Sequence, residues 1–384
     1  MNRNRALHCI FLLGLVSLLA DMTYEGLRSI TGQYLAILGA SGTIVGIVAG
    51  LGECCGHIFR IVYKYTLEKK KTSRFFTFLG YTLNCLSAPL LAFTASWPGA
   101  ALLFTVQRFG MAVRRPPRDA MLSPATEIMG PGLGFGIHEA LNRIGAVLGP
   151  IIITAILLTK GSYTQAFYLL TIPAALAVFV LIVAQKFIPH KKPKKEILPE
   201  AKTFSQRYWL GVIAISLVAA GTVHFSLISY HVQKTSLFNP SFVPLIFAAG
   251  MIIDGIGALL LGRWYDTRGM IAPIIALSLA CFSPILLFLG GTIVLCLGIF
   301  FWALGITILQ SLGRALVSDL APSHRRGRAF GIFHVSFGAF WFLGSAFMGF
   351  LYDTSIPLMV TFSVLTQSMA VLVLVSITYN RTLQ

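Results

Sequence analysis

Charged side chains are scarce in this sequence. Asp, Glu, Lys and Arg make up 11% of the 384 residues, whereas a soluble domain contains roughly a quarter. Apolar residues make up 56%, and the mean hydropathy is +0.79. This composition excludes an ordinary soluble domain and predicts a protein that resides in a lipid bilayer.

Three further absences exclude whole classes of site. The six cysteines have no CxxC spacing, which argues against a disulfide framework or a metal site. The sequence has no glycine-rich phosphate loop ending in lysine, so ATP is not expected as the energy source. His138 and Glu139 begin a near match to HExxH, but Asn142 replaces the second histidine and excludes a zinc protease. We therefore expect no metal, no cofactor and no enzymatic activity.

What the chain does contain is a succession of long apolar runs. A helix needs about 20 residues to cross ~30 Å of hydrocarbon. The predicted spans are residues 8–31, 42–63, 75–94, 98–113, 135–158, 164–187, 209–232, 242–263, 271–289, 293–313, 329–351 and 357–379. The sequence therefore predicts an all-α integral membrane protein with twelve transmembrane helices.

The second half of the chain repeats the first half at an offset of 195 residues. Within one ungapped stretch the identities are Ala120, Ser123, Gly132, Phe135, Gly136, Ile137, Leu148 and Gly149 with Ala315, Ser318, Gly327, Phe330, Gly331, Ile332, Leu343 and Gly344. Duplicated hydrophobic halves are typical of transporters, because two related bundles can enclose a site between them. We predict two six-helix bundles, residues 1–187 and 208–384, joined by a basic cytoplasmic linker, residues 188–207.

Positive charge is distributed unevenly along the chain. Most of the 30 Lys and Arg residues fall in the termini and in every second predicted loop, among them Arg114, Arg115 and Arg118. The positive-inside rule then places both termini in the cytoplasm. Because topology accounts for the net charge of +17, we expect no nucleic-acid partner.

Two motifs carry a resemblance to a known family. Gly262, Asp266 and Gly269 form a G-x-x-x-D-x-x-G pattern in the predicted loop after span eight. It resembles the corresponding loop of the major facilitator superfamily. The resemblance implies that fold, alternating access, a monomer, and a gating role for these three residues.

The second motif lies in predicted span five. Gly136, Gly145, Gly149 and Pro150 resemble the glycine-rich motif of the superfamily's antiporters. Glycines four residues apart let two helix backbones approach closely, and a proline there offers a hinge. The resemblance points to the branch that exchanges drugs or metabolites for protons.

Predicted span one has a polar face. Asp21, Tyr24, Glu25 and Arg28 follow i, i+3, i+4, i+7 spacing and share one side of a helix. Ionisable groups within a membrane helix are costly, so they indicate function. We expect Asp21 or Glu25 to exchange the coupling proton and Tyr24 and Arg28 to line the substrate cavity. The alternative is a structural salt bridge between one of the carboxylates and Arg28.

Other spans contribute further candidates. In span five, Glu139 is a proton-coupling candidate, and Asn142 and Arg143 are cavity candidates; the alternative is a pair that pins a cytoplasmic loop. The resemblance implies that Arg108, next to Gln107 in span four, approaches the carboxylates of span one. In the second half Asp254 is either a proton site or a helix-to-helix hydrogen bond. The remaining cavity candidates are Tyr230, Gln310 and Arg314.

The sequence thus predicts a secondary active transporter of a small organic solute. Buried carboxylates and the antiporter-like glycines favour proton-coupled efflux. The alternative is proton-coupled uptake of a small nutrient, an anionic one if Arg108 and Arg143 bind it. A receptor or membrane enzyme would need a soluble sensing domain or a nucleophile constellation, and neither is visible. We expect a multi-pass protein of the plasma membrane, which in a bacterium is the inner membrane, with the solute, protons and the lipid bilayer as partners.

Overall fold

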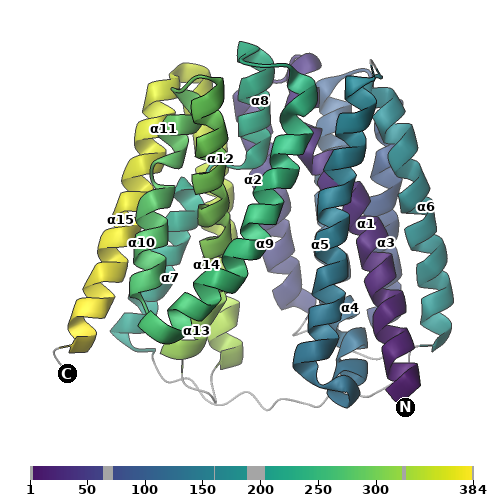
Figure 1. Ribbon diagram of the computed structural model, residues 1–384, viewed down its shortest axis with the longest axis horizontal. Coiled ribbons are helices and arrows are strands. Elements are labelled where there is room, and N and C mark those ends of the chain that lie inside the picture. The colour runs from purple at the N-terminus through teal and green to yellow at the C-terminus, as the bar shows by residue number, and fades with distance from the viewer. Residues whose placement is uncertain (1–2, 64–71, 160, 188–203, 322–325, 383–384) are drawn as a thin grey trace. The chain divides into compact units, whose positions relative to one another are not determined.

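The computed structural model describes residues 3–63, 72–159, 161–187, 204–321 and 326–382, and every regular element in these ranges is a helix (Figure 1). The first half contains α1 (Arg3–Ile37), α2 (Gly42–Val62), α3 (Thr72–Leu91), α4 (Trp97–Met129), α5 (Pro131–Leu158) and α6 (Tyr163–Phe187). The second half contains α7 (Gln206–Gly221), α8 (Phe225–Thr235), η2 (Pro240–Phe242), α9 (Val243–Arg268), α10 (Ile271–Ala280), α11 (Ser283–Phe288), α12 (Thr292–Thr307), η3 (Ile308–Leu312), α13 (Gly313–Leu320), α14 (Arg326–Thr354) and α15 (Ile356–Thr382). Most of the predicted linker, residues 188–203, lies outside the described ranges.

The chain forms two compact units. Unit 1 comprises Met1–Gly39, Cys55–Lys195 and Asn239–Ala248, and unit 2 comprises Ala40–Cys54, Glu196–Phe238 and Ala249–Gln384. In unit 1, α1 packs against α3, α4, α5 and α6. In unit 2, α7 packs against α14 and α15.

Ten helical stretches of the described chain are long and apolar enough to cross a membrane. Four of them combine consecutive elements: α7 with α8, η2 with α9, α10 with α11, and α12 with part of η3. Helices α3 and α4, of 20 and 33 residues, are not among the ten. Both have polar side chains among their apolar ones, and α4 also contains four arginines. Arginine-rich α4 supplies part of the site described below.

Helix α4 continues to Met129, beyond the predicted end of span four at residue 113. Arg114, Arg115 and Arg118, which the sequence predicts as loop residues, are therefore helical. Pro116 and Pro117 lack the backbone N–H that a helix interior needs, which is why the sequence predicts an end there. Burial of Arg114 and Arg118 in unit 1 holds this segment in the helix.

Spans seven, nine and ten were each predicted as one continuous helix, and the structure interrupts all three. The break between α7 and α8 falls at Thr222–His224, where the imidazole of His224 caps α8 by accepting the Ser226 N–H at 3.2 Å. The break between α10 and α11 precedes Pro284, which lies in the first turn of α11, where its missing N–H leaves no helical hydrogen bond unmade. In span ten, η3 is a π-turn between α12 and α13.

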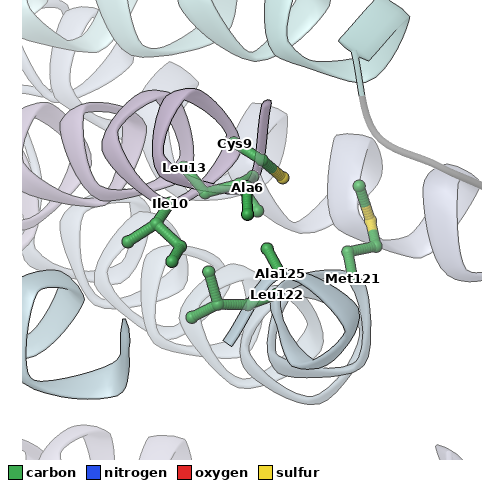
Figure 2. Close-up of a cluster of buried hydrophobic side chains, with 7 residues drawn as sticks. All are labelled: Ala6, Cys9, Ile10, Leu13, Met121, Leu122 and Ala125. Carbon is green, nitrogen blue, oxygen red and sulfur yellow. The ribbon is translucent and has the colours of Figure 1, made fainter. Parts of the chain in front are cut away.

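Two apolar clusters pack around α1. The first contains Ala6, Cys9, Ile10 and Leu13 of α1 with Met121, Leu122 and Ala125 of α4, and Figure 2 shows the two groups facing each other. The second contains Val16 and Ala20 of α1 with Tyr81 and Cys85 of α3 and Ala174, Ala177 and Leu181 of α6. The polar residues Ser17 and Asp21 therefore project from a helix whose neighbouring positions are packed in apolar side chains.

Candidate functional site

A buried ion pair joins α1 to α4. The carboxylate of Asp21 binds Nη2 of Arg114, and the two residues are 5% and 0% exposed. The guanidinium also lies 4.5 Å from the ring centre of Tyr81, a cation–π contact with α3. Two further nitrogens of Arg114, Nε and Nη1, have no hydrogen-bond partner in the described structure. Asp21 thus accounts for only part of the hydrogen-bonding capacity of this arginine.

A second ion pair lies one turn further along α1. Oε2 of Glu25 is 3.2 Å from Nη1 of Arg28, and each residue is 7% exposed. The guanidinium of Arg28 lies 5.6 Å from the ring centre of Phe247, in the α9 segment that belongs to unit 1. Asp21 and Glu25 therefore bind different arginines. The predicted pairing of Glu25 with Arg28 is present.

Glycines of α5 determine how closely α1 is held. A Cβ at Gly145 would overlap the carbonyl of Leu18, and one at Gly149 would overlap that of Met22. These carbonyls belong to the turn of α1 that carries Asp21. The predicted close approach is thus present at both glycines, whereas Gly136 has no atom within 4 Å of a Cβ position. At Pro150, the carbonyl accepts the Thr154 hydroxyl at 3.0 Å.

Helix α4 makes further contacts with α1 and α3. Nε2 of Gln107 donates to the carbonyl of Tyr24 at 3.3 Å. The carbonyl of Gln107 accepts from Asn84 Nδ2 of α3 at 3.2 Å. Arg108, beside Gln107, is 3% exposed. Tyr24 and Gln107, predicted as cavity residues, are therefore joined by a hydrogen bond.

A polar network surrounds Ser17, one turn before Asp21. The Ser17 hydroxyl lies 3.0 Å from the hydroxyl of Tyr81 and 3.1 Å from Nε2 of His138, and it accepts from Nη1 of Arg118 at 3.3 Å. Arg118 also binds the carboxylate of Asp119 at 2.7 Å. The side chain of Asp119 is 49% exposed, so the network reaches from the surface of unit 1 to its interior.

Not every candidate of α5 is buried. Oε1 of Glu139 and Nε of Arg143 are 3.2 Å apart, with side chains 59% and 34% exposed, and Asn142 donates to Oε2 of Glu139 at 3.5 Å. These three residues form a local cluster along one exposed side of α5. Their side chains are more exposed than those of Asp21 and Arg114.

The candidates of the second half are dispersed. Asp254 is fully buried in α9, and Oδ1 accepts the Thr307 hydroxyl of α12 at 3.0 Å. The hydroxyl of Tyr230 donates to the Ala40 carbonyl at 3.0 Å within unit 2. Gln310 lies in the π-turn η3, and the side chain of Arg314 lies outside the described part of the chain. Asp254 thus makes the hydrogen bond that was its alternative role.

The predicted loop after span eight is largely helical. Gly262 and Asp266 belong to the last turns of α9, and only Gly269, with φ of +60°, turns the chain. Glycine is suited to this left-handed conformation because it has no Cβ. Asp266 is exposed. The position predicted for these residues is corrected accordingly, while their gating role stays a prediction.

Sequence reasoning missed Arg114, Ser17, Tyr81 and Arg118 as parts of the site. Arg114 and Arg118 follow the predicted end of span four at residue 113, so the sequence predicts them as loop charges. Ser17 follows the spacing of the α1 face, four residues before Asp21, and this spacing was the available signal. Among the described residues, no group of three or more His, Cys, Asp or Glu is arranged to hold a metal ion.

The sequence profile described as "Major Facilitator Superfamily" matches residues 13–345 and 210–382. The chain belongs to the major facilitator superfamily. A relative in Mycobacterium tuberculosis, described as an uncharacterized protein, is 33% identical over 383 residues, covering 96% of this chain and 92% of the relative. An uncharacterized MFS-type transporter of Methanocaldococcus jannaschii is 25% identical over 374 residues, covering 90% and 89%.

Solved structures of this superfamily share the fold. The nucleoside transporter NupG matches with a TM-score of 0.75 and 14% identity, covering 97% of this chain and 98% of that chain. A bacterial homologue of the human lysosomal transporter Spinster, inward-facing and occupied, matches with a TM-score of 0.76 and 11% identity, covering 99% and 98%. The protein is therefore an all-α, multi-pass membrane transporter of the major facilitator superfamily fold that moves a solute, and it is not an enzyme.

Proposed function

We propose that this major facilitator superfamily protein exports a small organic solute in exchange for protons, with Asp21 as the principal coupling group. The observation that carries the proposal is the buried pair of Asp21 with Arg114 between α1 and α4. Separating two charges that are out of water is costly unless one of them is neutralised. Protonation of Asp21 neutralises it and allows α1 and α4 to change their contact.

The second ion pair extends this coupling along α1. Glu25 and Arg28 lie one turn beyond Asp21, and Arg28 contacts Phe247. Phe247 belongs to the α9 segment that packs within unit 1. Protonation of Glu25 would release Arg28 from its carboxylate while leaving the aromatic contact. We therefore assign Glu25 the secondary role, and Glu139 and Asp254 smaller ones.

Export is favoured over uptake by the glycine motif of α5. Gly145 and Gly149 bring α5 against the turn of α1 that carries Asp21. A motif associated with antiporters thus packs against the turn of α1 that carries the proposed proton site. Gly136, Pro150, Gly262, Asp266 and Gly269 are proposed as further gating positions, and the buried polar residues of α1 and α4 as cavity positions.

A second candidate function is proton-coupled uptake of an anionic solute. It is favoured by Arg114, whose Nε and Nη1 have no partner in the described structure. A carboxylate or phosphate oxygen could accept a charge-assisted hydrogen bond from either of these two nitrogens. Under either function we propose a monomer in the plasma membrane. We also propose that both termini lie in the cytoplasm, which is supported by the excess of Lys and Arg in the termini and in every second predicted loop.

The test is proton release from liposomes that contain the purified protein. The solute panel should contain tetraphenylphosphonium, a hydroxamate siderophore, a nucleoside, a dipeptide and a phosphorylated sugar. Efflux is supported if an inward proton gradient drives export of one member, and uptake if the same gradient drives its accumulation. Asp21→Asn should lower coupled flux ~10²-fold, the contribution of a positioned proton-transfer group.

Ser216→Ala is the matched control. Ser216 occupies the repeat position of Asp21, is 3% exposed and carries no charge. This variant should keep wild-type coupling. Equal proton release by wild type and Asp21→Asn, with a solute that is transported, would reject Asp21 as the coupling group.

A further inference from the structure

The hydroxyl of Ser17 lies within hydrogen-bonding distance of three polar groups, and the hydrogen bonds among them can be arranged in more than one way. It lies 3.0 Å from the Tyr81 hydroxyl, 3.1 Å from His138 Nε2 and 3.3 Å from Arg118 Nη1. Ser17 and Tyr81 are fully buried, and His138 and Arg118 are 3% and 7% exposed. Water therefore contributes little to the choice of partners, and the four groups must satisfy one another.

Counting donors and acceptors leaves two arrangements. A serine hydroxyl has one hydrogen and two lone pairs, and arginine can only donate. Arg118 therefore occupies one lone pair of Ser17. If His138 carries a hydrogen on Nε2, Ser17 accepts it and donates its own hydrogen to Tyr81. If Nε2 is bare, Ser17 donates to His138 and accepts the hydrogen of Tyr81.

The direction of the Ser17–Tyr81 hydrogen bond thus depends on whether Nε2 of His138 carries a hydrogen, and protonation of His138 ensures that it does. The ring of Tyr81 lies 4.5 Å from the guanidinium of Arg114, which binds Asp21. When Tyr81 donates to Ser17, its hydroxyl hydrogen is held there. When Tyr81 accepts from Ser17, that hydrogen is released and can turn toward other groups, which changes the local dipole beside Arg114.

We propose that His138, Ser17 and Tyr81 form a hydrogen-bond relay through which the protonation of His138 affects the Asp21–Arg114 ion pair. The relay rests on the proposed coupling role of Asp21 and adds three positioning residues to it. Asp119, half-exposed and bound to Arg118, connects the network to the surface of unit 1. Apolar packing on both sides of Ser17 reduces the screening of these charges by water.

The charges around His138 come from two helices. Arg118, Asp119 and Arg114 of α4 and Asp21 of α1 act on its imidazole. Helix α6, which also packs on α5, contains no Asp, Glu, Lys, Arg or His between Tyr163 and Gln185, and η2 contains none. Neutralising Asp21 removes one of the two negative charges.

The direct test is NMR of the full-length protein in lipid nanodiscs, with ¹⁵N-labelled His and Arg and no solute. The Nε–H signal of Arg114, assigned from Arg114→Lys, should change with pH at the midpoint at which His138 titrates. Tyr81→Phe removes one hydroxyl and keeps the ring over Arg114, so the Arg114 signal should stop following His138. His138→Gln should abolish the same pH-dependent change.

Two further variants serve as a control and as a substitute for Tyr81→Phe. His8→Gln removes an exposed histidine of α1 and should leave the Arg114 titration unaltered. Should Tyr81→Phe fold poorly, Ser17→Ala interrupts the relay at its centre and should give the same loss. An Arg114 signal that keeps following His138 in Tyr81→Phe or Ser17→Ala overturns the relay.

Proton release driven by tetraphenylphosphonium, measured in liposomes, separates this inference from the proposed function. If Asp21→Asn abolishes release but the Arg114 signal ignores His138, the relay fails and the coupling role of Asp21 stands. If tetraphenylphosphonium is transported and Asp21→Asn releases protons normally, the coupling role fails, and the Arg114 titration alone decides the relay. A uniform fall in rate at all pH values in Tyr81→Phe, with an unchanged pH profile, indicates a purely structural role and also overturns the relay.

Discussion

Helix α1 and the α7–α8 pair correspond through the 195-residue repeat, yet they differ in continuity and charge. Helix α1 runs unbroken for 35 residues and buries Asp21, Glu25 and Arg28. The α7–α8 pair is interrupted at Thr222–His224 and contains no Asp, Glu, Lys or Arg between Tyr208 and Gln233. One copy has thus kept an intact helix with ionisable groups, and the other has a break lined by neutral polar groups.

The break in unit 2 is well supplied with hydrogen bonds. The carbonyl of Gly221 accepts from Gln367 Nε2 at 3.1 Å and from the Ser363 hydroxyl, and the carbonyl of Val223 accepts from Trp302 Nε1 at 2.8 Å. Backbone groups freed from a helix are tolerated inside a membrane protein only when others satisfy them. Helix α1 therefore carries the charged groups of the two repeat copies, and α7–α8 supplies a bend.

The largest effect on stability is expected when the charged pair of α1 is broken. Asp21→Asn leaves Arg114 buried without its counter-ion, and a lost partner of a buried pair destabilises by about 3–5 kcal/mol. Thermal unfolding in detergent should show a marked fall in the melting temperature. The double variant Asp21→Asn/Arg114→Gln should recover much of this fall without recovering coupled transport. No recovery in the double variant would show that the carboxylate stabilises the fold by some other contact.

The next effect tests the close helix packing that the two regions share. A Cβ at Gly149 would overlap α1 at the Met22 carbonyl, and a Cβ at Gly344, its repeat partner, would overlap α7 at the Ala220 carbonyl. Gly149→Ala and Gly344→Ala should each destabilise by about 1–3 kcal/mol, since overpacking forces backbones apart. Gly132→Ala is the control, because nothing lies within 4 Å of a Cβ there. Equal melting temperatures for all three variants would contradict the close helix packing.

A smaller effect tests the break itself. Trp302→Phe removes the donor to the Val223 carbonyl and retains most of the ring. A buried acceptor left without a partner costs about 1–3 kcal/mol. Hydrogen exchange at the break reports the resulting local opening. Faster exchange of the amides of residues 222–226, with α1 unchanged, is the expected result. Uniform acceleration in both units would instead indicate global destabilisation.

The smallest effect concerns the exposed cluster of α5. Glu139→Gln should change stability by no more than about 0.5 kcal/mol, because ion pairs in solvent contribute little. Its effect on coupled transport should be much smaller than that of Asp21→Asn. A loss of coupling as severe as that of Asp21→Asn would transfer the principal proton site to α5.

The sequence predicted the repeat, the charged face of α1 and the close packing at Gly145 and Gly149. Each depends on local spacing or on an intrinsic property of a residue type. The pairing of Asp21 with Arg114 could not be predicted in this way, since it joins residues 93 apart in sequence that lie on two different helices. The break at Thr222–His224 was also missed, because partners from distant helices satisfy it and no proline or glycine pair marks it.

The π-turn η3 changes the helical phase along span ten. A π-turn accommodates one extra residue, which offsets the helical phase by roughly 100°. Backbone positions before Ile308 and after Leu312 therefore face different directions from those expected of an uninterrupted helix. Thr307, which binds Asp254, and the residues of α13 are out of step by about one residue. An alanine scan through 305–316 should accordingly show two periodic patterns of effect displaced by one position, in place of a single stripe.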